Sequence, residues 1–189
     1  MTAGGKEYVQ MYTDDEMDRC KVFCLDYFNG KSVSVATVAE DIAGTDLWLY
    51  TGTNKISIDV KISHVTWWNL VLLEYEHTYT DGVKKAGWTM QNDKRTDYIV
   101  YYYTRSNNFI VFPFQILRRI YKNNIEYIKR MCKDEEGGFK NYYVKNSYFE
   151  TENHLVPFEY IMEKMVEEMV NVVKVEIKEV ESGFEELFN

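Results

Sequence analysis

Residues 46–62, DLWLYTGTNKISIDVKI, decide how this chain folds. Apolar and polar residues alternate on both sides of a turn signal at 51–54, which is the pattern of a β-hairpin with one buried face. If the turn is symmetric about its centre, Asp46 lies opposite Asp59, and the aliphatic residues occupy the other face. A one-residue slip would send each set to the wrong face. The aliphatic pairs expected from this register are Leu47 with Ile58 and Leu49 with Ile56.

Two aspartates and a lysine share the polar face of this hairpin. Directly opposed residues have Cβ atoms roughly 4.5–5.5 Å apart, close enough for the carboxylates of Asp46 and Asp59 to bind one divalent cation. Lys61 follows Asp59 by two positions and therefore points to the same face. The pattern predicts a cation site beside an ammonium group. The alternative is a weak ion pair on the solvent side of an ordinary strand.

An Asp on one strand followed by Asp-x-Lys on the next resembles the motif of the PD-(D/E)xK nuclease superfamily. The motif residues here are Asp46 and the triplet at 59–61, and Thr45 stands where the motif has Pro. The similarity extends roughly from Val38 to Phe112 and is to small phage and bacterial nucleases. It implies the restriction-endonuclease-like fold, an α/β fold with a central mixed β-sheet flanked by α-helices.

The resemblance also implies a reaction, the hydrolysis of phosphodiester bonds in DNA with Mg²⁺ or Mn²⁺. Such a reaction needs a cation that offsets charge in the transition state and lowers the pKa of the attacking water. Carried over to this sequence, Asp46 and Asp59 are metal ligands and the Val60 backbone carbonyl completes the metal site. Lys61 then acts on the water or on the developing charge.

Further candidates lie between residues 69 and 96. Glu74 is an additional metal ligand if a strand expected at 69–79 lies beside residues 56–62, and otherwise it is a strand-end carboxylate or a partner for a nearby lysine. The polar segment 80–96 supplies the residues expected to contact DNA, although its lysines could be solvated charges and its tryptophan a core residue. These substrate-binding candidates are Lys84, Lys85, Trp88, Lys94 and Arg95.

The charge distribution divides the chain in two. The 189 residues carry a net charge of −8, and residues 150–189 contain 3 lysines and 11 glutamates, which leaves 19 basic and 19 acidic side chains in the rest. A neutral body can bind a polyanion where its basic residues cluster. We therefore expect a nuclease-like α/β core at 1–149 and an acidic helical C-terminal extension at 150–189.

Helices are predicted where apolar residues recur at helical spacing. A helix at 13–29 begins with a capping box formed by Thr13 and Glu16. Further helices are predicted at 115–131 and 158–173, and the methionine-rich stripe of the last is typical of core packing or of a homodimer interface. Residues 31–39 are interpreted as a short strand or the approach to one, 40–44 as a turn, and 134–148 as a loop.

Composition limits the remaining functional classes. The sequence has no apolar run long enough to span a membrane and no signal peptide, and its three cysteines lack zinc-site spacing, so we expect a cytoplasmic protein without a membrane partner. Two alternatives to a nuclease remain. One is a non-catalytic binding or structural protein of the same fold whose acidic tail docks a partner. The other is an inhibitor that mimics DNA through residues 150–189.

Overall fold

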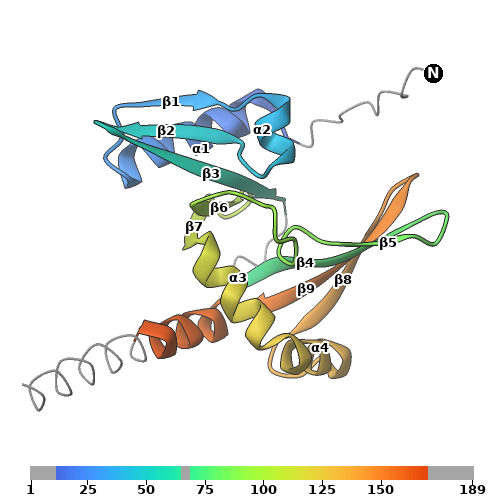
Figure 1. The fold of residues 1–189 in the computed structure, drawn as a ribbon. Coiled ribbons are helices and arrows are strands. Elements are labelled where there is room, and N and C mark those ends of the chain that lie inside the picture. The colour runs from blue at the N-terminus through green and yellow to red at the C-terminus, as the bar shows by residue number, and fades with distance from the viewer. Residues whose placement is uncertain (1–11, 65–68, 170–189) are drawn as a thin grey trace, which may run out of the picture. The chain divides into compact units, whose positions relative to one another are not determined.

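The computed structural model describes residues 12–64 and 69–169 (Figure 1). These residues form two compact units, which we treat separately. The first contains residues 12–64 and 94–113, and the second contains residues 69–93 and 114–169. Each unit has a β-sheet and helices, which confirms the predicted α/β class. No helix in the described ranges is long and apolar enough to span a membrane.

The first unit is built on a five-stranded mixed sheet with the order β1-β2-β3-β6-β7. β3 and β6 run parallel, whereas the other neighbouring strands are antiparallel. The strands are β1 (Ser32–Val35), β2 (Leu47–Thr51), β3 (Asn54–Ser63), β6 (Tyr98–Tyr103) and β7 (Asn108–Pro113).

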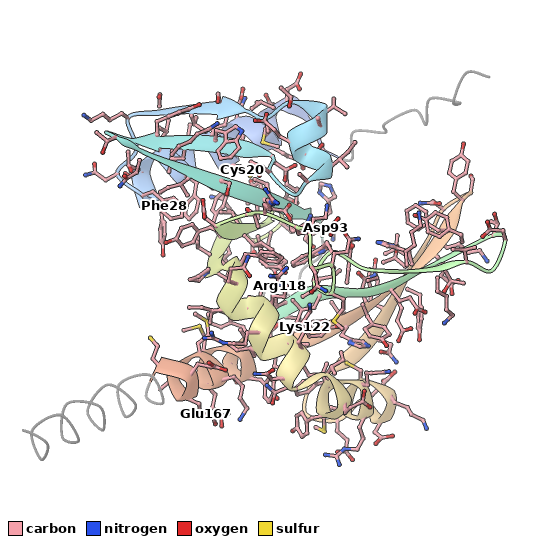
Figure 2. All side chains as sticks on the ribbon, in the orientation of Figure 1. Cys20, Phe28, Asp93, Arg118, Lys122 and Glu167 are labelled. Atoms are coloured by element: carbon pink, nitrogen blue, oxygen red, sulfur yellow. The ribbon has the colours of Figure 1, made fainter. Side chains whose placement is uncertain are left out.

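The hairpin formed by β2 and β3 has the predicted register. Leu47 lies opposite Ile58 and Leu49 lies opposite Ile56. The aliphatic face of the hairpin packs against α1 (Asp14–Tyr27), which begins with the predicted capping box. Figure 2 labels Cys20, one of the α1 residues that are fully buried in this core. The principal core residues contributed by α1 are Met17, Cys20 and Cys24.

The segment before this hairpin differs from the prediction. After β1 the chain forms a short helix, α2 (Val38–Ile42), where the sequence predicted the end of a strand and a turn. Thr37 accepts a hydrogen bond from the Glu40 backbone N–H, while the Glu40 carboxylate accepts one from the Thr37 N–H at 2.8 Å. This second capping box satisfies the free N–H groups at the start of the helix and so favours it over a turn.

The second unit contains a separate antiparallel sheet with the order β5-β4-β9-β8. The sequence predicted a central mixed sheet, which the first unit has, but it did not predict this second sheet. β5 and β8 lie in segments expected to be loops, and β9 occupies residues 150–157 of the expected helical extension. The strands are β4 (Leu70–Tyr79), β5 (Lys84–Ala86), β8 (Lys140–Lys145) and β9 (Phe149–Pro157).

The helices of the second unit also correct one prediction. The expected helix at 115–131 is two helices, α3 (Phe114–Asn123) and α4 (Ile125–Asp134), separated at Asn124. The Asn124 side chain donates to the Ile120 carbonyl at 2.8 Å, a local hydrogen bond that competes with continuation of the helix. Residues 158–169 are helical as predicted, whereas residues 170–189, with most of the acidic tail, lie outside the described ranges.

Candidate active site

Asp46 is positioned by the end of strand pairing in the first unit. Its backbone N–H donates to the Ile58 carbonyl at 2.9 Å, and its side-chain Oδ2 accepts from the Val60 N–H at 2.6 Å. β2 begins only at Leu47, so no backbone carbonyl of that strand is paired with Val60. The carboxyl group of Asp46 therefore satisfies a buried backbone donor at the point where the ladder stops.

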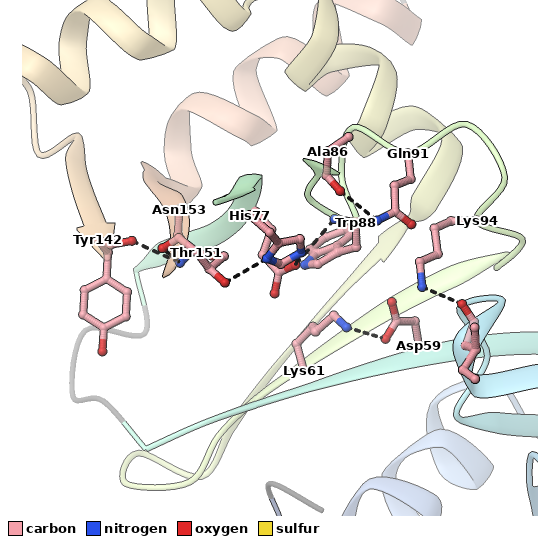
Figure 3. A network of polar contacts seen from close by, with 12 residues as sticks. Asp59, Lys61, His77, Ala86, Trp88, Gln91, Lys94, Tyr142, Thr151 and Asn153 are labelled. Carbon is pink, nitrogen blue, oxygen red and sulfur yellow. Dashed lines mark hydrogen bonds and ion pairs between the residues drawn. The ribbon is translucent and has the colours of Figure 1, made fainter. Parts of the chain in front are cut away.

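Asp59 and Lys61 lie on the face of β3 opposite the aliphatic core, as predicted. The Lys61 Nζ is 2.8 Å from Asp59 Oδ1 (Figure 3). The Asp59 side chain is only 7% exposed, whereas that of Lys61 is 31% exposed. The pair is thus a nearly buried carboxylate held by an ammonium group that reaches solvent, and the interpretation as an ordinary surface ion pair is wrong.

The two aspartates form an electrostatically coupled pair. Burial raises the pKa of Asp46 to about 8, and the nearby charge of Asp59 and a hydrogen bond between the two carboxyl groups act in the same direction. Lys61 and the Val60 N–H act in the opposite direction. Desolvation and like charge both disfavour a second negative charge at this position. The metal-free site consequently holds a proton on Asp46 at neutral pH.

This donor set fits a small hard cation. Two neighbouring buried carboxyl groups mark a position where positive charge is stabilised, and both groups offer oxygen ligands. Among the residues that the structure describes, no group of three or more His, Cys, Asp or Glu side chains is placed to hold a metal. Mg²⁺ commonly binds through one or two carboxylates and retains several waters, so two carboxylates and a carbonyl suit it.

Tyr12 is a site residue that the sequence did not indicate. Burial raises its pKa to about 12, and the charge of Asp46 adds to this effect while Lys61 opposes it. The phenol therefore remains protonated and interacts electrostatically with the carboxyl pair. In the sequence, the one indication of this role is that Tyr12 directly precedes the Thr13 capping box, because a helix start fixes the position of the residue before it.

Glu16 and His64 have the structural roles expected of them. One Glu16 oxygen accepts from the Thr13 N–H at 2.9 Å, as a capping residue, and the other is 3.4 Å from His64 Nδ1. His64 is exposed and lies 3.1 Å from the Thr104 hydroxyl. These contacts do not place either residue among the candidate cation ligands.

Two further side chains hold the site strands in register. Thr45, which replaces the motif proline, is buried and donates from its hydroxyl to the Arg95 carbonyl at 3.1 Å. The Asp97 carboxylate accepts from both the backbone N–H and the hydroxyl of Ser57, each at 2.8 Å. These contacts fix the residue before Asp46 and the start of the strand that pairs with Asp59.

The predicted DNA-contacting residues are divided between the two units. In the first unit, Lys94 donates from Nζ to the Ile42 carbonyl at 2.9 Å, and Arg95 is exposed. In the second, Lys84 forms an ion pair with Glu76, whereas Lys85 is exposed.

Trp88 is a core residue of the second unit. It is 4% exposed, and its ring centroid lies 5.9 Å from that of Phe114. Of the two readings that the sequence allowed for this side chain, core packing is therefore the correct one. An open substrate-binding surface does not include it.

The structure removes the reason for predicting Glu74 as a metal ligand. That role required β4 to lie beside β3, but β4 pairs with β5 and β9. The Glu74 carboxylate is 3.5 Å from both the Trp88 backbone N–H and the His77 ring. We therefore leave Glu74 out of the proposed ligand set.

Comparison with known proteins finds a structural similarity but no matching sequence family. No protein-family model matches the sequence, and no curated protein is similar to it. Among solved structures, the chain is similar to a bacterial homing endonuclease, I-Ssp6803I, with 16% sequence identity and a TM-score of 0.41. The match covers 56% of this chain and 69% of the endonuclease chain. A TM-score of this size does not establish a shared fold, so the function must be inferred from the site.

Proposed function

We propose that this protein is a divalent-cation-dependent nuclease that hydrolyses phosphodiester bonds in DNA. The observation that carries the proposal is the coupled pair of Asp46 and Asp59 with the Lys61 ammonium 2.8 Å away. Buried carboxylates are costly unless they bind a cation or a proton, and perturbed pairs of this kind gather at functional sites. The match to the PD-(D/E)xK motif relates this pair to phosphodiester chemistry.

Asp46, Asp59 and the Val60 carbonyl are the residues that would hold Mg²⁺ or Mn²⁺. A cation at this position supplies Lewis acidity, which activates a water molecule and offsets the charge that develops on the phosphate. Asp46 holds a proton in the metal-free protein and must lose it to become a ligand. Cation binding is therefore expected to release a proton and to strengthen as pH rises toward about 8, the pKa of Asp46.

Lys61 supplies a positioned positive charge. Asp59 fixes the direction of its Nζ, and its partial exposure lets the ammonium meet a phosphate group from solvent. An ammonium in this position orients the attacking water and stabilises negative charge on the phosphate oxygens. Asp59 thus serves both as a ligand and as the group that holds Lys61 in place.

Plasmid nicking and linear-duplex degradation, measured with Mg²⁺ and with Mn²⁺, test the proposal. The informative variant is Asp59→Asn, which keeps the size of the side chain but removes a charged ligand. The matched control is Asp26→Asn, an exposed aspartate on α1. We expect the wild type and the control to cleave and Asp59→Asn to be inactive, with Mn²⁺ binding lost in calorimetry. Equal cleavage by both variants would point to a contaminating nuclease and contradict the assignment.

The non-catalytic alternative predicts a different result. A binding or structural protein that retains this site would bind Mn²⁺ through Asp59 yet leave every DNA form intact. The same titration and cleavage measurements distinguish the two functions.

A further inference from the structure

The sheet of the second unit has two faces with different chemistry. Strand alternation and the observed register place six residues, which we call the lysine–aromatic face, on one side. Contacts agree with this placement: the Phe149 ring centroid is 5.0 Å from that of His77 and 5.4 Å from that of Tyr79. Lys85 Nζ lies 5.0 Å from the Tyr79 ring centroid. The lysine–aromatic face consists of His77, Tyr79, Lys85, Lys140, Tyr142 and Phe149.

Three glutamates of the same strands point the other way, whereas Glu74 of β4 lies on the lysine–aromatic side. Glu76 and Glu152 are direct partners in the register of β4 and β9, and Glu150 follows two positions from Glu152 on the same face. On this face, Lys84 forms an ion pair with Glu76. The buried His154 lies on the same face, and its Nδ1 is 2.7 Å from the Tyr121 hydroxyl of α3. The sheet therefore separates Glu76, Glu150 and Glu152 from Lys85 and Lys140.

The edge residues of the lysine–aromatic face are exposed, and its two lysines outnumber the one carboxylate on this side. Lys85 and Lys140 are exposed, and Tyr142 is 37% exposed. Within the described ranges, neither lysine forms an ion pair. The carboxylate on this side is Glu74, which is 3.5 Å from the His77 ring. His77 in turn lies 2.8 Å from the Thr151 hydroxyl (Figure 3).

The order of the strands arranges these groups across the sheet. Lys85 is on β5 and Lys140 is on β8, the two edge strands, while His77, Tyr79 and Phe149 are on the inner strands β4 and β9. In the register, Lys85 lies beside His77 and Lys140 lies opposite Leu155, so the two lysines are placed diagonally across the sheet. The row between them contains Glu74, Asn153 and Tyr142. Lysines neutralise phosphates, whereas aromatic and polar side chains contact bases and sugars, and strands are known to enter DNA grooves.

We propose that the lysine–aromatic face is a docking surface for duplex DNA. This inference rests on the proposed nuclease function, because it names a surface of the second unit that would bind the DNA on which a nuclease acts. Charge complementarity favours a polyanion on this side: the lysine–aromatic side has Lys85 and Lys140 against one carboxylate, whereas three glutamates outnumber two lysines on the opposite face. Of the five predicted substrate-binding residues, only Lys85 belongs to this surface.

Paired lysine variants test the inference with a matched control. Lys85→Ala/Lys140→Ala removes the two charges of the lysine–aromatic face. Lys84→Ala/Lys145→Ala removes two charges from the same two strands at positions that point to the acidic face. Both variants change the net charge equally. Binding of a labelled duplex is measured by fluorescence anisotropy in EDTA over a range of salt concentrations, after circular dichroism has confirmed that each variant is folded.

The expected result is a change in salt dependence. Each phosphate contact contributes about 0.9 to the slope of log K against log salt, so losing two contacts lowers the slope by about 1.8. We expect this reduction for Lys85→Ala/Lys140→Ala and less than half of it for the control. A second comparison uses neighbouring exposed tyrosines of β8, of which only Tyr142 is on the lysine–aromatic face and could donate its hydroxyl to a phosphate. Tyr142→Ala is expected to weaken binding about fivefold, and Tyr143→Ala to have little effect.

The possible outcomes separate this inference from the proposed function. Equal effects of the two lysine pairs would overturn the docking surface, even if Asp59→Asn abolishes cleavage. Loss of single-stranded but not duplex binding in Lys85→Ala/Lys140→Ala would overturn the assignment to duplex DNA. Binding that depends on this face in a protein that cleaves no DNA would instead support the surface and reject the nuclease function.

Discussion

The Asp46 side chain acts as part of the β-sheet: its Oδ2 accepts the Val60 backbone N–H at 2.6 Å, where β2 has ended. The same carboxyl group shares a hydrogen bond with Asp59 and is expected to bind the cation. One side chain therefore connects the strand register to the chemistry of the site. Substitutions at this position should separate the two roles.

Asp46→Asn should stabilise the metal-free protein at alkaline pH. The folded-state pKa of about 8 exceeds the ordinary value of 3.8 for an aspartate, so between these values the folded protein keeps a proton that the unfolded chain has lost. Wild-type stability consequently falls as pH rises through this window. Asn is neutral throughout and still accepts the Val60 N–H. Urea unfolding in EDTA should show a stability advantage for Asp46→Asn that grows from pH 5 to about 8.

Asp46→Ala is the comparison for this prediction. It also removes the buried charge, but it leaves the Val60 N–H without its acceptor, which costs about 1–3 kcal/mol. We expect Asp46→Ala to be less stable than Asp46→Asn at every pH. Equal stability of the two variants would show that the hydrogen bond at 2.6 Å contributes nothing.

Lys61→Met should reduce turnover while preserving cation binding. The substitution keeps an unbranched apolar side chain but removes the ammonium, and loss of such a positioned group slows catalysis by a factor of about 10²–10⁴. Lys55→Met is the control. Lys55 is also on β3, but its Nζ lies over the Trp48 ring, 3.5 Å from the ring centroid, and it is four positions before Asp59 in the strand. Single-turnover cleavage and Mn²⁺ calorimetry provide the two readouts. Loss of Mn²⁺ binding in Lys61→Met would contradict the assigned role.

His154 should make the second unit sensitive to acid. It is fully buried, and burial together with the charge of Lys129 lowers its pKa to about 4, below the ordinary value of 6.5 for a histidine. Between these values the unfolded chain binds a proton that the folded protein excludes, so stability falls as pH drops through the window. At pH 5 the loss relative to neutral pH is about 2 kcal/mol.

The variant His154→Gln tests this contribution, because glutamine does not titrate in that range. Denaturant unfolding at pH 7.5 and pH 5 should show a smaller loss of stability in His154→Gln than in the wild type. The tyrosine partner offers a control: Tyr121→Phe removes the contact at 2.7 Å but keeps the titrating ring. An identical pH dependence in the wild type and His154→Gln would show that other groups cause the acid sensitivity.

Gly87→Ala should destabilise the second unit through a steric clash. A Cβ at Gly87 would lie 2.6 Å from the backbone carbonyl carbon and oxygen of Glu74, which cannot move without shifting β4. Overpacking of this kind costs about 1–3 kcal/mol. Gly82→Ala is a useful comparison, because its Cβ would meet no atom within 4 Å and only its φ of +81° opposes the change. Thermal unfolding should rank Gly87→Ala as the less stable variant.

Local patterns in the sequence were sufficient for part of this structure. Alternation around the turn at 51–54 determined the register of β2 and β3 and put Asp59 and Lys61 on one face. The capping box of Thr13 and Glu16 located the start of α1. These features depend on residues that are close in sequence, so their signals are contained in short windows.

Other features arose only from contacts between distant segments. The pairing of β4 with β9 created a second sheet and removed Glu74 from the expected cation site. The register of that sheet placed Lys85 and Lys140 on the face opposite Glu76, Glu150 and Glu152. Burial raised the pKa of Asp46, and the core of the second unit enclosed Trp88. Strand partners and desolvation depend on which remote segments meet, which no short window of sequence specifies. The sequence by itself determined the motif, and tertiary packing decided its electrostatics and the surface proposed to bind DNA.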